Sequence, residues 1–554
     1  MWRWATHAHA HTLRPVMNAP QTIDVAALTE DQVRTLAQQL IEQVSEQAGE
    51  LITRQLKIDK LTHEMAVLRH LKFAAQSERF KSGQLPLIAE AVDEDLAALA
   101  QEIEAVQPSP EPTAAARTTP RPQRSPGRQG LPQSLPRTVI AHEPEHPQCP
   151  CGCALRRIGE DICEKLDFIP GTFNVERHIR GKWVCTARTC VHSTVVQAPM
   201  PAYVIDKGLA PPGLLAHVLI AKYADHQPLY RQEGIYARAG CGIARSTLAQ
   251  WVGQCGVHLQ PVVDALKAAL LGERVLQADE TPVALLEPGS GKTRRAYLWS
   301  YGSTAYSPLK AVVYDFTPSR AGAHARAFLK EEDQGPDEPG APWCGTLVCD
   351  DYGGYKALFA GESGMREAGC LAHARRKFHE LMVSQKSPLA GQALEYYRQL
   401  YEVEREVAAL DADERGRIRG FKAQPVADAL RAWLIEQRSK VPGGGAIARA
   451  IDYSLRRWTA LTHYLTDGRV PADNNWIENR MRPIALGRKN WLFAGSLRAG
   501  QRAAAIMSLI ESARMNDLDP LAYLKDVLTR LPTHKMKDIG KLLPHRWKQE
   551  TSPR

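Results

Sequence analysis

Between residues 274 and 382 short apolar runs alternate with helical segments, in an order that few folds share. RVLQADETP, RAYLWSYGS and KAVVYDFTP read as three strands, because each is rich in β-branched and aromatic residues and is bounded by glycine- or proline-containing turns. AGAHARAFLKEE then reads as a helix and GTLVCDD as a fourth strand. Gly369 to His373 is a candidate fifth strand that leads into a helix over 374–382. The pattern predicts one mixed sheet with helices between its later strands.

This element order is that of a ribonuclease H-like α/β core, which places the first and fourth strands side by side at the sheet centre. Both strands end in acids, Asp279 with Glu280 and Asp350 with Asp351. Neighbouring residues of a strand point to opposite faces, so the pattern leaves open which member of each pair is functional.

A third acid, Glu478, lies in PADNNWIENRMRPIALGRKNWLFAG, which spans Pro471 to Gly495. One interpretation is a solvated helix with Glu478 and Arg482 as an ion pair four residues apart. The other is a metal site, because Mg²⁺ takes oxygen ligands and two-metal phosphoryl chemistry needs several carboxylates. Asp279, Asp350 and Glu478 are then the candidate catalytic acids and Mg²⁺ (or Mn²⁺) ligands.

Basic residues surround these acids in the sequence. We expect Pro483 to kink or end the helix soon after Arg482, which directs Arg488 and Lys489 at DNA. LAHARRKF supplies further candidate DNA contacts, with a solvated helix face as the alternative interpretation. The residues concerned are Arg375, Arg376, Lys377, Arg482, Arg488 and Lys489.

The gap from Asp350 to Glu478 is too long for one crossover, so we predict a helical insertion over 384–470 that divides the core into 271–383 and 471–525. A basic tail over 526–554 completes this end of the chain. The stretch from Ile477 to Arg554 holds 15 Lys plus Arg against 7 Asp plus Glu, nearly the whole net charge of +9. Such clustering favours a polyanion partner, with a solubilising tail as the alternative.

Residues 23–105 are helix-forming, with apolar stripes at Leu36, Leu40 and Val44 and again at Leu61 and Met65. We predict a coiled coil that dimerises the protein; the alternative is an amphipathic helix packed on its own chain. Residues 1–22 show no secretory signal and read as a disordered or non-native extension, with Met17 as the other possible start. Residues 106–140 are rich in proline and arginine and read as a linker.

Six of the 11 cysteines fall between Cys149 and Cys190. Two cysteine clusters at this separation resemble a zinc ribbon, which predicts a structural Zn²⁺ module over 141–205. The expected ligands are Cys149, Cys151 (or Cys153), Cys185 and Cys190, and buried free thiols are the alternative.

Residues 206–270 read as helical, and a glycine-bearing turn at Gly240 to Gly242 suggests a helix-turn-helix. Its second helix, capped near Ser246, offers Arg245, Thr247 and Gln250 to a DNA groove. Many helical hairpins share this pattern without touching DNA. No run of about 18 apolar residues predicts a membrane span.

These residues together resemble the DDE transposases of bacterial insertion sequences, specifically the large transposase of the family numbered sixty-six. The matching stretches run from about residue 60 to 525 and include IGEDICEKLDFIPGTFNVERHIRGKWVC, LQADETPV, CDDYGGYKALF, CLAHARRKF and NNWIENRMRPIALGRKNWLFAGS. The resemblance implies that Asp279, Asp350 and Glu478 are the catalytic acids. CTARTC is longer than the CxxC of relatives, which weakens the zinc assignment.

The resemblance implies an enzyme that binds the terminal inverted repeats of its element, cuts phosphodiester bonds with Mg²⁺ and joins the freed 3′-hydroxyls to target DNA. It also implies a cytoplasmic, nucleoid-associated bacterial protein that works as a homo-oligomer on double-stranded DNA, with accessory proteins of the same element as further partners. The rival interpretations are a DNA-binding protein that has lost catalysis and a nuclease without strand transfer.

Overall fold

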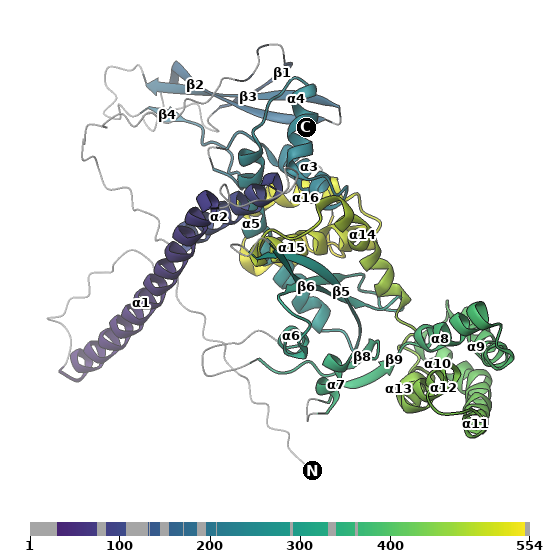
Figure 1. Ribbon diagram of the computed structural model, residues 1–554. Helices are drawn as coiled ribbons and strands as arrows, with labels where there is room; N and C mark the ends of the chain where they lie inside the picture. Colours follow the sequence, from purple (N-terminus) through teal and green to yellow (C-terminus); the bar gives the residue numbers. More distant parts are fainter. Residues whose placement is uncertain are drawn as a thin grey trace.

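The computed structural model describes residues 30–74, 85–106, 131, 133, 135–143, 155–169, 171–185, 195–206, 208–287, 292–330, 340–360 and 364–548. The expected extension at 1–22, most of the linker and the side chains of the four predicted zinc ligands lie outside these residues. In Figure 1 a sheet occupies the middle of the molecule, a second sheet lies above it, and one long helix projects to the side. None of the helices in the described ranges combines the length and apolarity that a membrane span requires.

The central sheet has five strands in the order β7-β6-β5-β8-β9. β5, β6 and β7 form an antiparallel meander, whereas β8 and β9 run parallel to β5. The five strands and the helices between them follow the order expected from the sequence, but two expected bounds are wrong. The first strand does not end at Asp279 and Glu280 but continues to Glu287. The fifth strand ends at Gly369, and residues 371–373, which were expected in it, belong to the following helix. Their bounds are β5 (Val275–Glu287), β6 (Lys292–Ser303), β7 (Val312–Thr317), α6 (Gly322–Phe328), β8 (Thr346–Cys349), α7 (Gly353–Phe359), β9 (Arg366–Gly369) and α8 (Leu371–Gln385).

Helices cover both faces of this sheet (Figure 1). On one face α14 packs against β5 and β6, and α15 packs against β7. On the other face the α7 residue Tyr355 packs against Trp299 of β6, edge to face. The C-terminal helices are α14 (Asn475–Trp491), α15 (Leu497–Met515) and α16 (Pro520–Arg530).

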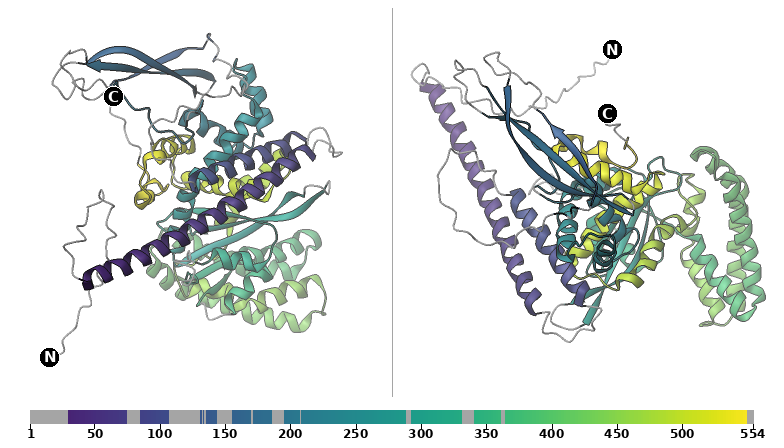
Figure 2. Two further views of the ribbon diagram at one scale, coloured as in Figure 1. Left: turned by 90° about the vertical axis from the view of Figure 1, so that its left-hand side faces the viewer. Right: turned by 90° about the horizontal axis from the view of Figure 1, so that it is seen from above.

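Residues 388–465 form the helical insertion, which in the view from above in Figure 2 stands apart from the rest of the chain. Its apolar core, in which Phe378 of α8 packs with residues such as Tyr397, Leu430 and Ile451, continues onto one side of the central sheet at Val348 and Ala368. Its elements are α9 (Pro388–Val407), α10 (Ala412–Ile418), a π-helical turn (Arg419–Ala423), α11 (Gln424–Lys440), α12 (Ala446–Arg456), α13 (Trp458–Thr462) and a 3₁₀ turn (His463–Leu465).

Arg419 is the buried charge at the centre of this insertion. Its guanidinium donates two hydrogen bonds to Glu404, at 2.8 and 2.6 Å. It also donates to the carbonyls of Tyr464 and Val470, each at 2.9 Å. Because these partners come from three separate segments, Arg419 holds the insertion together as one unit.

The N-terminal region is a helical hairpin of α1 (Glu30–Ala74) and α2 (Leu85–Val106), rather than one continuous helix. The far half of α1 projects from the body, with Leu40, Val44 and Leu51 exposed, whereas Leu61 is buried (Figure 2). In this chain the near half of α1 thus packs on its own protein.

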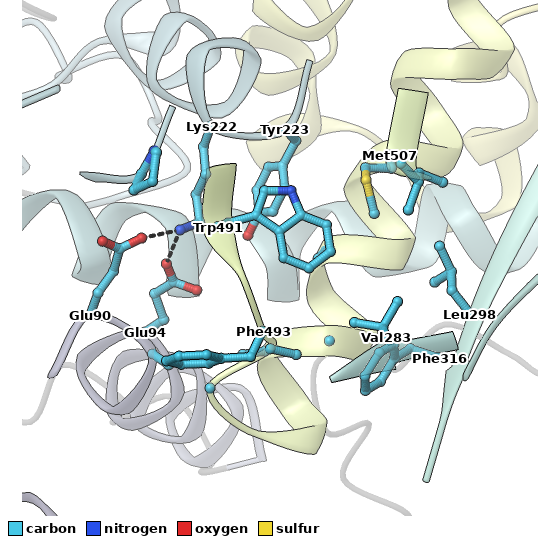
Figure 3. A pocket seen from close by; sticks show the side chains of 18 of the residues that line it. Glu90, Glu94, Lys222, Tyr223, Val283, Leu298, Phe316, Trp491, Phe493 and Met507 are labelled. Carbon is cyan, nitrogen blue, oxygen red and sulfur yellow. Dashed lines mark hydrogen bonds and ion pairs between the residues drawn. The ribbon is translucent and has the colours of Figure 1, made fainter. Parts of the chain in front are cut away.

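Buried ion pairs hold α2 against the body. Lys222 bonds to Glu90 and lies 3.0 Å from Glu94, and Arg502 reaches Glu94 at 2.7 Å and Asp95 at 3.0 Å. Figure 3 shows Lys222 between the two glutamates at one end of a pocket whose other labelled residues are mostly apolar, among them Val283, Trp491 and Phe493.

A smaller sheet of β1 (Arg137–His142), β2 (Leu155–Ile169), β3 (Thr172–Cys185) and β4 (Val196–Gln197) follows the linker. β2 and β3 are antiparallel, and Leu155 pairs with Cys185. The two cysteine clusters therefore adjoin the same end of this strand pair along the sequence.

Three helices connect the two sheets: α3 (Pro212–Tyr223), α4 (Leu229–Arg238) and α5 (Arg245–Leu271). The cap expected at Ser246 differs in the structure. α5 begins at Arg245 without a side-chain cap of its own, and the carboxylate of Glu233 in α4 accepts the Arg245 N–H at 2.9 Å. A neighbouring helix thus satisfies an N–H group that a local side chain was expected to satisfy.

The C-terminal segment, which the structure describes up to Lys548, is folded rather than a solvated tail. Two short 3₁₀ helices, Leu531–Thr533 and Met536–Leu542, follow α16. Leu542 and Leu543 are buried, and Trp547 donates to Asp526 at 2.6 Å. Apolar residues between the lysines therefore fold this segment onto the body despite its charge.

Replacing Arg419 by alanine should loosen the helical insertion. The change leaves Glu404 as an unpaired charge and removes donors from two buried carbonyls, which costs about 3–5 kcal/mol. Amide hydrogen exchange across α9 to α13 should become about 100-fold faster or more. Arg417→Ala is the matched control. Arg417 is only two residues from Arg419 but forms an exposed ion pair with Glu414, so its loss should leave exchange unchanged. Equal exchange in both variants would contradict the role given to Arg419.

Candidate active site

Asp279 and Asp350, the first two acids expected in the site, lie at the same height along two neighbouring parallel strands. Asp279 is in β5, and Asp350 directly follows β8. Gln277 pairs with Val348, two residues before each acid. Because the strands run parallel, Asp279 and Asp350 emerge together at the same end of the sheet centre.

Glu478 reaches the same place through the segment that starts α14. The side chain of Gln277 donates to the Asp473 carbonyl at 2.9 Å, and Asn474 donates to the Ala278 carbonyl at 2.8 Å. Asn474 is fully buried. These two bonds fix the first turn of α14, which contains Glu478, beside the β5 residues that precede Asp279.

The adjacent acids, Glu280 and Asp351, have cationic partners. Glu280 bonds to Arg320 and accepts from the Tyr355 hydroxyl at 2.7 Å. Asp351 lies 2.7 Å from Arg457 and 3.0 Å from Lys356. Within the described ranges no such ion pair joins a basic side chain to Asp279 or Asp350. The structure thus separates each pair of neighbours into one acid held in an ion pair and one without a direct ion pair.

The carboxylates around Asp279 shift its pKa. Burial, with the nearby charges of Glu280, Glu478 and Asp350, raises the pKa of Asp279 to about 7. One oxygen of Glu478, Oε1, is buried without a hydrogen bond. A divalent cation would relieve both the repulsion and the missing contact, so the donor set suits the Mg²⁺ that the sequence implies.

The carboxylates do not form a closed cage around one point. Among the described residues, the set whose possible ligand atoms all lie within 4.8 Å of one another is Cys370, His373 and Glu478. Glu478 has one oxygen 3.7 Å from His373 Nδ1 and the other 3.6 Å from Arg376. Its charged neighbours thus come from α8, and the ion pair considered with Arg482 is not among those of the described residues.

Pro483 does not end the helix, contrary to the expectation. α14 continues to Trp491 with Pro483 inside it. Beyond the helix, Ala494 bonds to the carbonyl of Ala284 at 2.8 Å and accepts the N–H of Leu286 at 2.9 Å. α14 is therefore attached to β5 at both ends, which holds the helix across the proline.

The expected basic contacts fall into two groups. Arg488 donates to Thr281 Oγ1 at 3.2 Å and to the Pro282 carbonyl at 2.7 Å, so it points back at β5. The others are solvent-exposed on α8 and α14: Arg375, Arg376, Lys377, Arg482 and Lys489.

α4 and α5 form the expected helical hairpin. Gly240 in the turn has φ of 85°, a left-handed conformation that favours glycine. At the start of α5, Gln250 is exposed, and Arg245 and Thr247 are half-buried.

Sequence reasoning missed the residues that assemble the site. Gln277 and Asn474 were not singled out as structural, because their partners are 196 residues away. Cys370 lies in the quoted CLAHARRKF and three residues before His373, a helical spacing that could have signalled a shared face.

Comparison with known proteins identifies the class. Residues 207–502 match the description "Transposase IS66 family", and residues 508–545 match "IS66 C-terminal element". Residues 147–190 match "zinc-finger binding domain of transposase IS66", and residues 60–140 match "Transposase C of IS166 homeodomain". The fold and these matches define a transposase, a DNA-binding and DNA-processing enzyme with a zinc-finger domain.

The chain belongs to the Transposase IS66 family, which confirms the resemblance seen in the sequence. It is similar over most of its length to proteins of Sinorhizobium fredii that carry the name "uncharacterized protein". It is 36% identical to y4jD over 76% of this chain and 82% of the relative. It is 32% identical to y4hP over 91% of this chain and 90% of the relative, and 35% identical to y4qI over 89% of this chain and 90% of the relative.

Asn474→Ala should release the first turn of α14. The substitution leaves the buried Ala278 carbonyl without its donor, at a cost of about 1–3 kcal/mol. Amide exchange in the first turns of α14 should speed up accordingly, while exchange in α11 stays the same. Asn490→Ala, on the exposed side of the same helix, should have no effect. Protection of α14 that survives Asn474→Ala would show that Asn474 does not hold it.

Proposed function

We propose that the chain is a DDE transposase in which Asp279, Asp350 and Glu478 act as one magnesium site on a ribonuclease H-like core. The observation that carries the proposal is the common location of these acids, together with the separate neutralisation of Glu280 by Arg320 and of Asp351 by Arg457. The strand order and the helical insertion before α14 support it.

Mg²⁺ held by the three acids would activate the attacking oxygen and stabilise the charge that develops on the phosphate. In the first reaction a water oxygen bonds to phosphorus and the P–O3′ bond breaks, which leaves a free 3′-hydroxyl on the element end. In the second, that hydroxyl attacks a phosphodiester of target DNA and displaces a target 3′-oxygen. Neither reaction needs a covalent bond to the protein.

The chain's own residues hold the DNA in place. Exposed Arg375, Lys377, Arg482 and Lys489 flank the acids from α8 and α14 and would bind phosphates. The start of α5 would enter a groove of the terminal repeat, with Gln250 reading base edges. We assign structural Zn²⁺ to the cysteines of residues 147–190, with Cys149, Cys151, Cys185 and Cys190 as ligands.

Two element ends must be brought together for joining, which requires at least two protomers. The exposed apolar stripe on the projecting half of α1, with Leu40, Val44 and Leu51, is the surface that we assign to the coiled coil between them.

Glu478→Gln should abolish strand cleavage and leave binding to the element ends nearly intact. Asp350→Asn should lower the cleavage rate by at least about 100-fold, because metal charge stabilisation is worth several kcal/mol. Asp351→Asn is the matched control, with a smaller loss, since Asp351 is engaged by Arg457. Rates are measured on labelled element ends in Mg²⁺.

Unchanged cleavage by Glu478→Gln would refute the assignment. Metal-dependent nicking by the wild type excludes a pure DNA binder. A joined product between element end and target DNA separates a transposase from a nuclease.

Arg375→Ala and Gln250→Ala should weaken DNA binding in different ways. Loss of one phosphate contact weakens binding to every sequence and reduces the slope of log affinity against log salt by about 1. Loss of a base contact costs about 1–3 kcal/mol on the element end alone. Arg417→Ala, exposed on α10, is the control. Equal losses on both DNAs for Gln250→Ala would contradict base reading by α5.

A further inference from the structure

Cys370, His373 and Glu478 form a compact cluster of three different ligand types. Cys370 immediately precedes α8, His373 lies in its first turn, and Glu478 lies in the first turn of α14. The possible ligand atoms of all three are within 4.8 Å of one another. Leu371 N–H donates to the Ala472 carbonyl at 3.0 Å and Asn474 N–H to the Cys370 sulfur at 3.3 Å, so backbone contacts fix the two helix starts together.

Two polar atoms in the cluster are buried without a hydrogen bond. They are His373 Nδ1 and Glu478 Oε1, which lie 3.7 Å apart. Buried polar atoms normally have a hydrogen-bond partner, so two such atoms that face each other leave both lone pairs available to an ion. Cys370 is 1% exposed, so its sulfur faces the same enclosed space rather than solvent.

The chemistry of the three groups selects the kind of metal. Mg²⁺ takes oxygen ligands and does not favour thiolate or imidazole, whereas Zn²⁺ binds sulfur, nitrogen and carboxylate oxygen together. Zn–N and Zn–O bonds of about 2.0–2.2 Å place tetrahedral ligands roughly 3.3–3.5 Å apart. His373 Nδ1 and Glu478 Oε1 are 3.7 Å apart, so a small side-chain adjustment brings them to this separation.

We propose that Cys370, His373 and Glu478 form a binding site for Zn²⁺ or a similar borderline transition metal, and that occupancy of this site inhibits the enzyme. Three protein ligands leave a fourth position for water. The Glu478 carboxylate cannot coordinate Zn²⁺ at this site and Mg²⁺ at the proposed catalytic site with the same oxygens. Bound Zn²⁺ therefore holds the Glu478 carboxylate away from Asp279 and Asp350. The inhibitory part of the proposal rests on the proposed function; the metal site does not.

Binding replaces a proton on sulfur. Burial raises the pKa of the Cys370 thiol to about 12, so the metal-free sulfur keeps its proton. Formation of the Zn–S bond therefore releases one proton to solvent, with no change of oxidation state.

The direct test is zinc binding to the full chain. Metal-depleted protein is equilibrated with buffered Zn²⁺, and bound metal per chain is measured for the wild type, Cys370→Ser, His373→Gln and Cys344→Ser. The zinc-finger region contributes equally to all four, so differences report the new site. Cys370→Ser and His373→Gln should each lose one zinc per chain or bind it at least about 100-fold more weakly. Loss of a residue that only hydrogen-bonds to a metal ligand already lowers metal affinity about 10–100-fold, and loss of a ligand should cost more.

Cys344→Ser is the matched control because Cys344 is exposed and outside the cluster, and it should bind zinc as the wild type does. Co²⁺ in place of Zn²⁺ gives a second readout, in which thiolate charge-transfer absorbance is lower for Cys370→Ser than for Cys344→Ser. Two site variants guard against misfolding of either one. Wild-type stoichiometry and affinity in both would overturn the metal site.

The inhibitory role is tested on DNA cleavage at fixed Mg²⁺ with increasing free Zn²⁺, each variant being compared with its own zinc-free rate. The zinc concentration that halves the rate should rise at least about tenfold in Cys370→Ser and stay unchanged in Cys344→Ser. Equal inhibition of both would refute the inhibitory role. If the wild type binds the extra zinc but never cleaves, the proposed function fails while the metal site stands.

Discussion

Two hydrogen bonds across 196 residues complete the proposed catalytic region: Gln277 to the Asp473 carbonyl and Asn474 to the Ala278 carbonyl. They join the start of α14 to β5 after the chain has passed through the whole insertion. Without them β5 and β8 would still present Asp279 and Asp350, but the start of α14 would be held by α8 rather than by β5. The third acid therefore depends on buried amides that carry no charge and take no part in chemistry.

The second constraint is electrostatic. Five carboxylates lie within β5, directly after β8 and in the first turn of α14, and such a group cannot all remain charged and uncompensated in a partly buried place. The fold neutralises two of them with cations from other elements, Arg320 for Glu280 and Arg457 for Asp351. Arg457 comes from the end of the insertion, which gives that domain a direct electrostatic link to the site. The remaining three are the acids to which we assign the magnesium site.

Much of the fold followed from local sequence. Strand-forming runs beside acids predicted β5 and β8, although β5 continues past its acids to Glu287. Helix-forming composition predicted the insertion, because the spacing of apolar residues along the chain indicates which face of an element is buried. Prediction from neighbouring residues failed where contacts with distant segments determine the end of a helix or the direction of a side chain. Pro483 was expected to kink or end the helix, and it does not end it: α14 continues to Trp491, and Ala494 beyond it bonds to β5. Arg488 read as a DNA contact, yet it donates to Pro282. The choice between Asp350 and Asp351 likewise depended on Arg457, more than 100 residues away.

The insertion also has a consequence in time. Glu478 lies 128 residues after Asp350, the difference of their positions in the chain. At a synthesis rate of about 5–20 residues per second, the ribosome adds the glutamate roughly 6–26 seconds after the second aspartate. During that interval the nascent chain already holds α4 and α5, which precede both residues, but not its third acid. On the roles proposed for these residues, the nascent chain can engage DNA before it has the third metal ligand, and the position of one large domain in the sequence sets the delay.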